Sequence, residues 1–132
     1  MNKDTFEKLV AEEFPNAIPE KFRGLIKNVA FLVEDVPSEE VRIKEHLHDD
    51  ETLLGYYHGI PNTARGEGYG VGGVLPDTIT LYQLPIEEEA NELGGGEAAV
   101  RKVIRETIWH EVAHHFGMDE HEVQERERKN DA

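Results

Sequence analysis

One amphipathic pattern in the last third of the chain constrains the fold more than any other feature of the sequence. Between residues 97 and 116, apolar residues recur at intervals of three, four and five, and most charged residues fall between them. Because an α-helix turns by about 100° per residue, this spacing gathers the apolar side chains into one stripe. Such a helix needs a partner surface that buries the stripe. Its members are Val100, Val103, Ile104, Ile108 and Val112.

The rest of the chain offers the elements for that surface. Residues 3–14 show helical spacing of apolar residues, and Pro15 is expected to end this first helix. Three short apolar segments bounded by proline or glycine are typical of β-strands. The order of one helix, three strands and a long helix predicts an α+β domain, a small sheet with its helices on one side. The predicted strands lie within residues 29–36, 53–61 and 78–85.

Length and composition narrow the class of protein. With 132 residues the chain is expected to form a single domain over residues 1–132. It has no cysteine, so a bound metal would need histidine and carboxylate ligands. No apolar run reaches the length of a membrane span, and the N-terminal residues do not resemble a signal peptide. These features predict a cytoplasmic protein that does not bind a membrane.

The charge balance argues against nucleic acid as a partner. The chain has 28 acidic and 14 basic residues, a formal net charge of −14, which repels phosphate backbones. The one basic cluster, residues 126–129, is short and interleaved with glutamate. The acidity either attracts basic peptides or merely keeps the protein in solution, and solubility is the simpler interpretation.

Chemistry concentrates at the end of the long predicted helix. His110 and His114 lie four residues apart, so both imidazoles project from one face of the helix. Two imidazoles at this spacing can hold one zinc ion at about 2.1 Å each. Glu111 lies beside them and can reach a water on that ion without being a ligand. Zinc lowers the pKa of such a water to roughly 7, and the glutamate can take its proton during hydrolysis.

Interpretations in which the histidines have no role in metal binding remain open. A helix in a chain rich in histidine and glutamate can match the His-Glu-x-x-His pattern by chance and end as a solvated charged surface. His115 falls inside the apolar stripe, which favours a core or supporting role over coordination. His121 is a candidate ligand or a surface residue, and His46 and His48 lie in an acidic segment that favours solvent.

The segment HEVAHHFGMDEHEV resembles the motif of the small bacterial zincin-like metallopeptidases. The segments LLGYYHGIP and GGVLPDTITLYQLPI, and the N-terminal FEKLVAEEF and IPEKFRGLIKNVAFLVEDVPS, are also similar to that family, so the resemblance covers nearly the whole chain. It implies a minimal zincin-like fold, in which a small mixed sheet packs against an N-terminal helix and the long helix. It also implies one zinc ion held by His110 and His114, with Glu111 as general base.

The third ligand departs from the family pattern. That pattern is His-Glu-x-x-His-x-x-Gly-x-x-Asp, and the position of its last aspartate is occupied here by Glu120. Either Glu120 coordinates with its longer side chain, or the preceding Asp119 takes its place. The glycine register favours Glu120. Three protein ligands would leave a fourth position open for water, as catalysis requires.

The resemblance also implies how a substrate binds. Zincins pair an extended peptide with an edge strand, and residues 78–84 would be that strand, with Thr80 and Tyr82 as substrate contacts. The glycine-rich residues 65–73 could close over the cleft. A chain this short leaves the cleft shallow, to be completed by a partner or by a second copy in a homo-oligomer.

These observations predict a zinc-dependent metallopeptidase that acts on peptides or proteins. The alternative is a non-catalytic metal-binding or peptide-binding module that retains the motif. A zinc hydrolase acting on other substrates, including RNA, is a third interpretation, and the negative charge counts against RNA.

Overall fold

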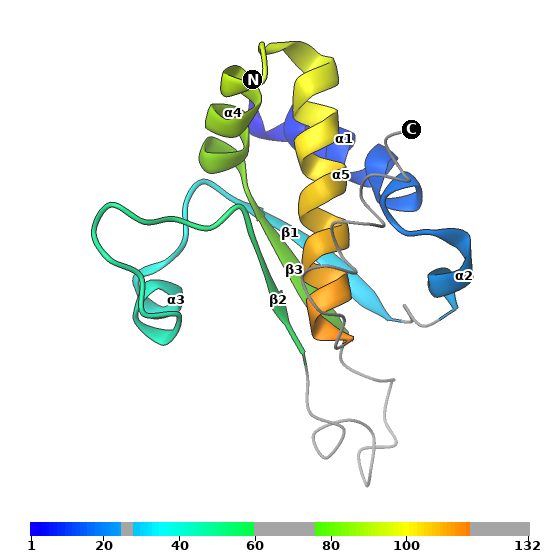
Figure 1. The fold of residues 1–132 in the computed structure, drawn as a ribbon, viewed down its shortest axis with the longest axis horizontal. Coiled ribbons are helices and arrows are strands. Elements are labelled where there is room, and N and C mark those ends of the chain that lie inside the picture. The colour runs from blue at the N-terminus through cyan, green and yellow to red at the C-terminus, as the bar shows by residue number, and fades with distance from the viewer. Residues whose placement is uncertain (25–27, 60–75, 117–132) are drawn as a thin grey trace, which may run out of the picture.

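The computed structural model describes residues 1–24, 28–59 and 76–116. The described residues form a mixed α+β arrangement, which confirms the predicted fold class (Figure 1). None of the helices in these three ranges is both long enough and apolar enough to span a bilayer. In chain order the elements are α1 (Lys3–Ala17), α2 (Glu20–Arg23), β1 (Val29–Glu34), α3 (Glu39–Lys44), β2 (Gly55–His58), β3 (Asp77–Tyr82), α4 (Gln83–Glu92) and α5 (Gly96–His115).

The strands form a mixed sheet in the order β1-β3-β2. β3 pairs in parallel with β1, from Val29 opposite Asp77 onward, and antiparallel with β2, where Gly55 lies opposite Leu81. β3 is therefore the central strand, and the expectation that residues 78–84 form an edge strand is wrong. The order of strands along the chain does not determine their order in the sheet, because β3 inserts between the two earlier strands.

The hydrophobic core lies where α5 packs against α1, α4, β2 and β3, with α1 crossing behind α5 (Figure 1). The whole predicted stripe of α5 is buried there. The helix itself begins and ends one residue earlier than the predicted range of 97–116. The stripe meets side chains from α1, β3 and α4. These are chiefly Phe6, Leu9, Val10, Ile79, Leu81 and Ile86.

Two prolines lie inside helices, where the sequence suggested boundaries. Pro15 was expected to end α1, but the helix continues to Ala17. A proline this close to the helix end removes one late hydrogen bond only, and the Arg23 guanidinium donates to the carbonyls of Pro15 and Ile18 at 2.8 and 3.0 Å. Pro85 was interpreted as the end of a strand. It lies in the first turn of α4, where a missing N–H costs nothing.

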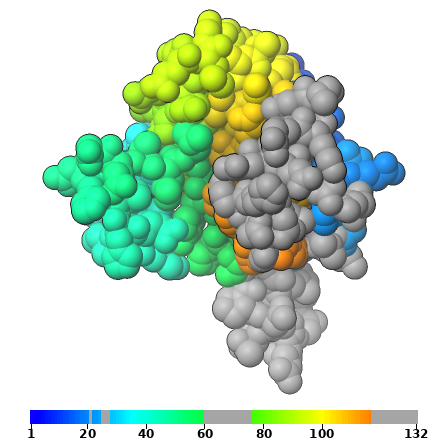
Figure 2. All heavy atoms as spheres, in the orientation of Figure 1, coloured from blue at the N-terminus to red at the C-terminus, as the bar shows by residue number. Residues whose placement is uncertain are grey.

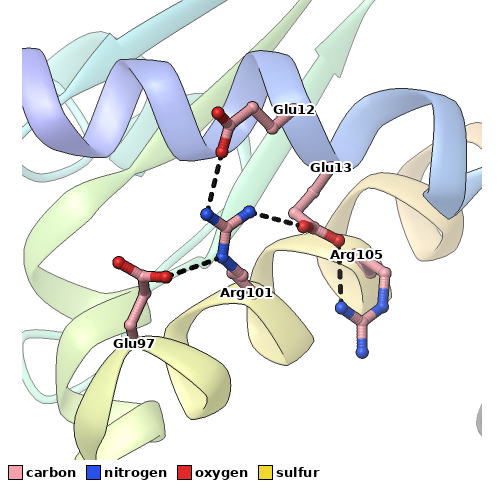
Figure 3. Close-up of polar contacts among 5 residues, drawn as sticks. All are labelled: Glu12, Glu13, Glu97, Arg101 and Arg105. Atoms are coloured by element: carbon pink, nitrogen blue, oxygen red, sulfur yellow. Dashed lines mark hydrogen bonds and ion pairs between the residues drawn. The ribbon is translucent and has the colours of Figure 1, made fainter.

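An ionic network joins α1 to the first half of α5 (Figure 3). Arg101 donates to Glu12 and Glu13 on α1, each at 2.8 Å, and to Glu97 one turn earlier on α5. Arg105 donates to the other oxygen of Glu13 at 3.0 Å. The Glu13 side chain is only 7% exposed, so the two arginines compensate a carboxylate that would otherwise be buried without a partner. The network holds the long helix in a fixed place against α1.

Candidate metal centre

The second half of α5 brings the predicted metal-binding residues together. His110, Glu111 and His114 lie on its last two turns, and the adjoining buried stripe holds this part of the helix against the core. The His110 and Glu111 side chains are half-buried, and His114 is exposed. The three functional groups therefore lie at a surface while the helix that presents them is packed.

The two imidazoles converge. The Nε2 atoms of His110 and His114 lie 3.1 Å apart, and the ring centroids are separated by 4.6 Å at an interplanar angle of 60°. Two nitrogens bound at 2.0–2.1 Å to one tetrahedral zinc would be separated by about 3.4 Å. The rings thus need only a small adjustment to share one ion, and the donor set fits zinc.

Glu111 is held beside this pair by β2, which among the described strands pairs with β3 alone. The backbone N–H of Tyr57 donates to Glu111 Oε1 at 3.2 Å. Burial raises the pKa of the Glu111 carboxyl above its ordinary value, although the Tyr57 N–H and the charges of His110 and His114 act in the opposite direction. A carboxylate whose pKa is shifted towards neutral pH is suited to accept and return a proton.

Gly55 allows β2 to approach α5 this closely. A Cβ at position 55 would lie 2.7 Å from Thr107 Cγ2 and 3.2 Å from the Thr80 carbonyl oxygen. Neither Gly55 nor Tyr57 was among the residues predicted for the site. A glycine inside a strand is the available signal, because it often marks a close approach of another element.

A cleft of about 390 Å³ opens along the side of α5 next to Glu111. One wall comes from residues 52–55, which lead into β2, and the other from α5, with Glu89 of α4 contributing at one end. Figure 2 shows the segment before β2 lying directly against the side of α5, with α4 beyond it. The candidate metal ligand His110 lines the same cleft, so a molecule bound there would lie beside the catalytic candidates.

Sequence comparison agrees with this geometry. The family model for zincin-like metallopeptidases matches residues 26–130, most of the chain. The chain belongs to the zincin-like metallopeptidase family. No curated protein matches the sequence. Membership implies zinc in general terms, and the two convergent imidazoles are the described residues that fit it.

Both candidates for a third ligand in this zincin-like metallopeptidase lie outside the described residues. Glu120 and Asp119, the two candidates, both belong to residues 117–132, as does His121, and the glycine-rich residues 65–73 are likewise outside. Within residues 1–24, 28–59 and 76–116, no three histidine or acidic side chains gather in a group able to hold a metal ion. The choice between Glu120 and Asp119 therefore stays open.

The predicted substrate contacts, Thr80 and Tyr82, assumed an edge strand, but in this zincin-like fold they lie in a central strand. Thr80 and Tyr82 are 8% and 1% exposed in the central strand, which is paired on both sides. An extended peptide cannot pair with β3. Burial, followed by the charge of Glu34, raises the pKa of the Tyr82 hydroxyl to about 12, as expected for an enclosed phenol.

His115 supports the site without joining the pair of imidazoles. Its ring stacks on Tyr57 with centroids 3.9 Å apart, and its Nε2 lies 3.9 Å from Asp77 Oδ2. The Tyr57 hydroxyl donates to the same Asp77 oxygen at 2.7 Å. The side chain is 36% exposed, so the expected core position is wrong, while the expected supporting role agrees with these contacts. The stack fixes Tyr57, whose N–H positions Glu111.

Proposed function

We propose that this protein is a zinc-dependent peptidase in which His110 and His114 bind the metal and Glu111 is the general base. One observation carries the proposal: on a single packed helix, two imidazole Nε2 atoms converge to 3.1 Å beside a half-buried carboxylate. Zinc bound there would polarise the scissile carbonyl and lower the pKa of a water to roughly 7. Glu120 or Asp119 would complete the ligand set.

Glu111 moves the proton in this proposal. The Tyr57 N–H fixes Oε1, which leaves Oε2 to take a proton from the attacking water. The same carboxyl group then returns the proton to the amine that leaves. Burial, which raises the Glu111 pKa, makes both transfers easier near neutral pH.

The peptide would lie along β2 and not along β3. Among the described strands β2 is bonded to β3 on one side only, and it is the strand whose backbone reaches Glu111. Antiparallel pairing with its outer edge would bring a substrate carbonyl near the two imidazoles. This arrangement replaces the predicted pairing with residues 78–84.

The test is hydrolysis of a mixed peptide library by zinc-loaded protein. Cleavage should disappear with a chelator, return when zinc is added, and be absent from Glu111→Gln. The Gln side chain keeps an oxygen to accept the Tyr57 N–H, so the variant removes the base with little change of shape. Equal turnover by the wild type and Glu111→Gln would remove Glu111 from the mechanism.

A non-catalytic metal-binding or peptide-binding module is the second candidate. The observation that favours it is Glu120 at the position where the family motif has aspartate. A longer ligand could occupy the position that water needs. This candidate predicts stoichiometric zinc and measurable peptide binding with no cleavage that responds to chelator and zinc.

A further inference from the structure

The cleft beside Glu111 combines apolar walls with carboxylates. Leu53, Leu54 and Val103 form apolar parts of its lining, and Glu89 and Glu106 add two carboxylates besides Glu111. No lysine or arginine is among the described residues that line it. Its volume of about 390 Å³ lies within the range of pockets that bind small molecules or single side chains.

The two additional carboxylates come from different helices. Glu106 precedes His110 by one helical turn, so both side chains project from the same face of α5, and Glu89 reaches the cleft from α4. Glu106 lies 3.9 Å from Lys102 Nζ, a half-exposed pair of the kind that contributes little. The charge of the cleft is therefore negative, and it has the same sign as the net charge of the whole chain.

A buried hydroxyl in the same cleft points independently to a ligand. Thr107 lines the cleft and is only 5% exposed. Its Oγ1 is the one buried side-chain oxygen or nitrogen in the described part of the chain that has no hydrogen-bond partner. Such groups are rare in folded proteins, because losing water without gaining a partner is unfavourable. A rotation of the Thr107 side chain towards the cleft would let a polar group of a bound molecule satisfy this hydroxyl.

We propose that this cleft is a subsite for a lysine or arginine side chain of the peptide substrate, an inference that rests on the proposed peptidase function. The aliphatic stem would lie along Leu53, Leu54 and Val103, as long basic side chains commonly do on apolar surface. The cationic end would reach Glu89 and Glu106. The net charge of −14 would also concentrate basic peptides around the protein.

Binding is measured first, with catalysis removed. Zinc-loaded Glu111→Gln protein is titrated into fluorescein-labelled alanine-based octapeptides that carry lysine, arginine, norleucine or glutamate at one varied position, and anisotropy is recorded. Lysine and arginine peptides should bind roughly tenfold tighter than the norleucine peptide, the preference expected from two partly screened carboxylates. Raising the salt concentration should reduce this preference for lysine and arginine peptides, because salt screens the charges. Equal affinity for all four peptides, or no binding of any, overturns the proposal.

Variants then locate the preference. In the Glu111→Gln background, Glu89→Gln with Glu106→Gln should reduce it to below about threefold. Glu88→Gln removes a charge from the same exposed turn of α4 but does not line the cleft, so it should leave the preference unchanged. Thr107→Val keeps the shape and removes the hydroxyl, and should weaken binding of the lysine and arginine peptides about threefold or more. A preference that survives the double substitution overturns the proposal.

Cleavage by the wild type distinguishes a failure of the basic subsite from a failure of the proposed peptidase activity. Zinc-loaded wild-type protein is incubated with the library, and mass spectrometry locates the cut bonds. Cuts without enrichment of lysine or arginine at any fixed distance would overturn the subsite and leave the peptidase intact. Carboxylate-dependent binding of basic peptides with no cutting would overturn the peptidase and leave a basic-peptide binding cleft. Enriched cuts support both.

Discussion

Two carboxylates, Glu13 of α1 beside the first half of α5 and Glu111 in its second half, have surroundings that differ in kind. Glu13 receives hydrogen bonds from Arg101 and Arg105 (Figure 3). Burial alone would raise the Glu13 pKa, but these arginines outweigh it and the pKa is lowered. Glu111 receives a backbone N–H, its neighbours are imidazoles, and burial raises its pKa. Glu13 is thus held as a fixed anion, whereas Glu111 is left ready to exchange a proton.

The comparison also separates the half of α5 that holds the helix in place from the half that carries the candidate site. The first half of α5 is joined to α1 by ion pairs and by core packing, and the second half contacts β2 directly beside the cleft. α1 precedes residues 26–130, the part of the chain that the family model matches. The helix that bears the family motif is therefore fixed in place partly by a helix outside the matched residues.

Removing each carboxylate should give opposite results, and the larger effect is expected at Glu111. Glu111→Gln should lower kcat/KM for a cleaved peptide by about 10² to 10⁴, the usual contribution of a general acid–base group. Its thermal midpoint should not fall, because glutamine keeps the acceptor for the Tyr57 N–H. Steady-state kinetics and calorimetry on one preparation check both parts. A large fall in the thermal midpoint would mean that Glu111, like Glu13, stabilises the fold.

The adjacent histidines allow the same contrast within the metal centre. His114→Ala should weaken zinc binding by more than about 100-fold, because it removes a proposed ligand, while His115→Ala should weaken it by less than about tenfold. Zinc per chain after dialysis, measured by elemental analysis, separates the two. Similar zinc loss from both variants would mean that His115 coordinates, contrary to its stacking on Tyr57.

Gly55 tests whether the approach of β2 matters to the site. Gly55→Ala should destabilise the fold by about 1–3 kcal/mol, because the new Cβ would press on Thr107 Cγ2 and on the β3 backbone. Adding Thr107→Ser removes that methyl and should recover part of the loss. Chemical denaturation of the two single variants and the double variant forms the cycle. Fully additive losses would show that the two residues do not press on each other.

The sequence predicts the two ends of α5 unequally. The helix itself follows from its long apolar period, and the spacing of His110 and His114 follows from the helix. Glu13 already has helical spacing in the sequence, but its two arginine partners lie 88 and 92 residues away, and no local pattern pairs them. The contact between Tyr57 and Glu111 spans 54 residues and depends on β2 being an edge strand.

The other differences have equally local causes. α3 escaped prediction because none of its residues is buried, so it has no apolar period. α4 escaped because it follows β3 directly and contains Pro85 in its first turn. The stripe that suggested a core position for His115 is real, but it ends where the helix reaches Tyr57 and solvent.

The Glu13 network should have a smaller effect, confined to stability. Glu13→Gln should reduce the free energy of unfolding by about 1–2 kcal/mol at neutral pH, since it weakens two charged hydrogen bonds that are partly open to solvent. The kcat/KM of the folded protein should change by less than about twofold, because the network lies away from the cleft. Glu88→Gln controls for the loss of one charge. A large loss of kcat/KM at full stability would mean that the α1 contact also positions Glu111.

The smallest effect is the pH dependence of the difference in unfolding free energy between the wild type and Glu13→Gln. The pKa of Glu13 is ordinarily 4.5 and is lowered in the folded protein, so the folded state binds this proton less readily than the unfolded state. Its contribution is therefore complete above about pH 4.5 and is lost as the pH falls through the folded pKa. The stability difference between the wild type and Glu13→Gln should be constant from about pH 6 to 8 and shrink steadily below 4.5. Denaturation series at each pH measure it, and a difference that stays constant down to about pH 3 would show that the two arginines do not stabilise the ionised form.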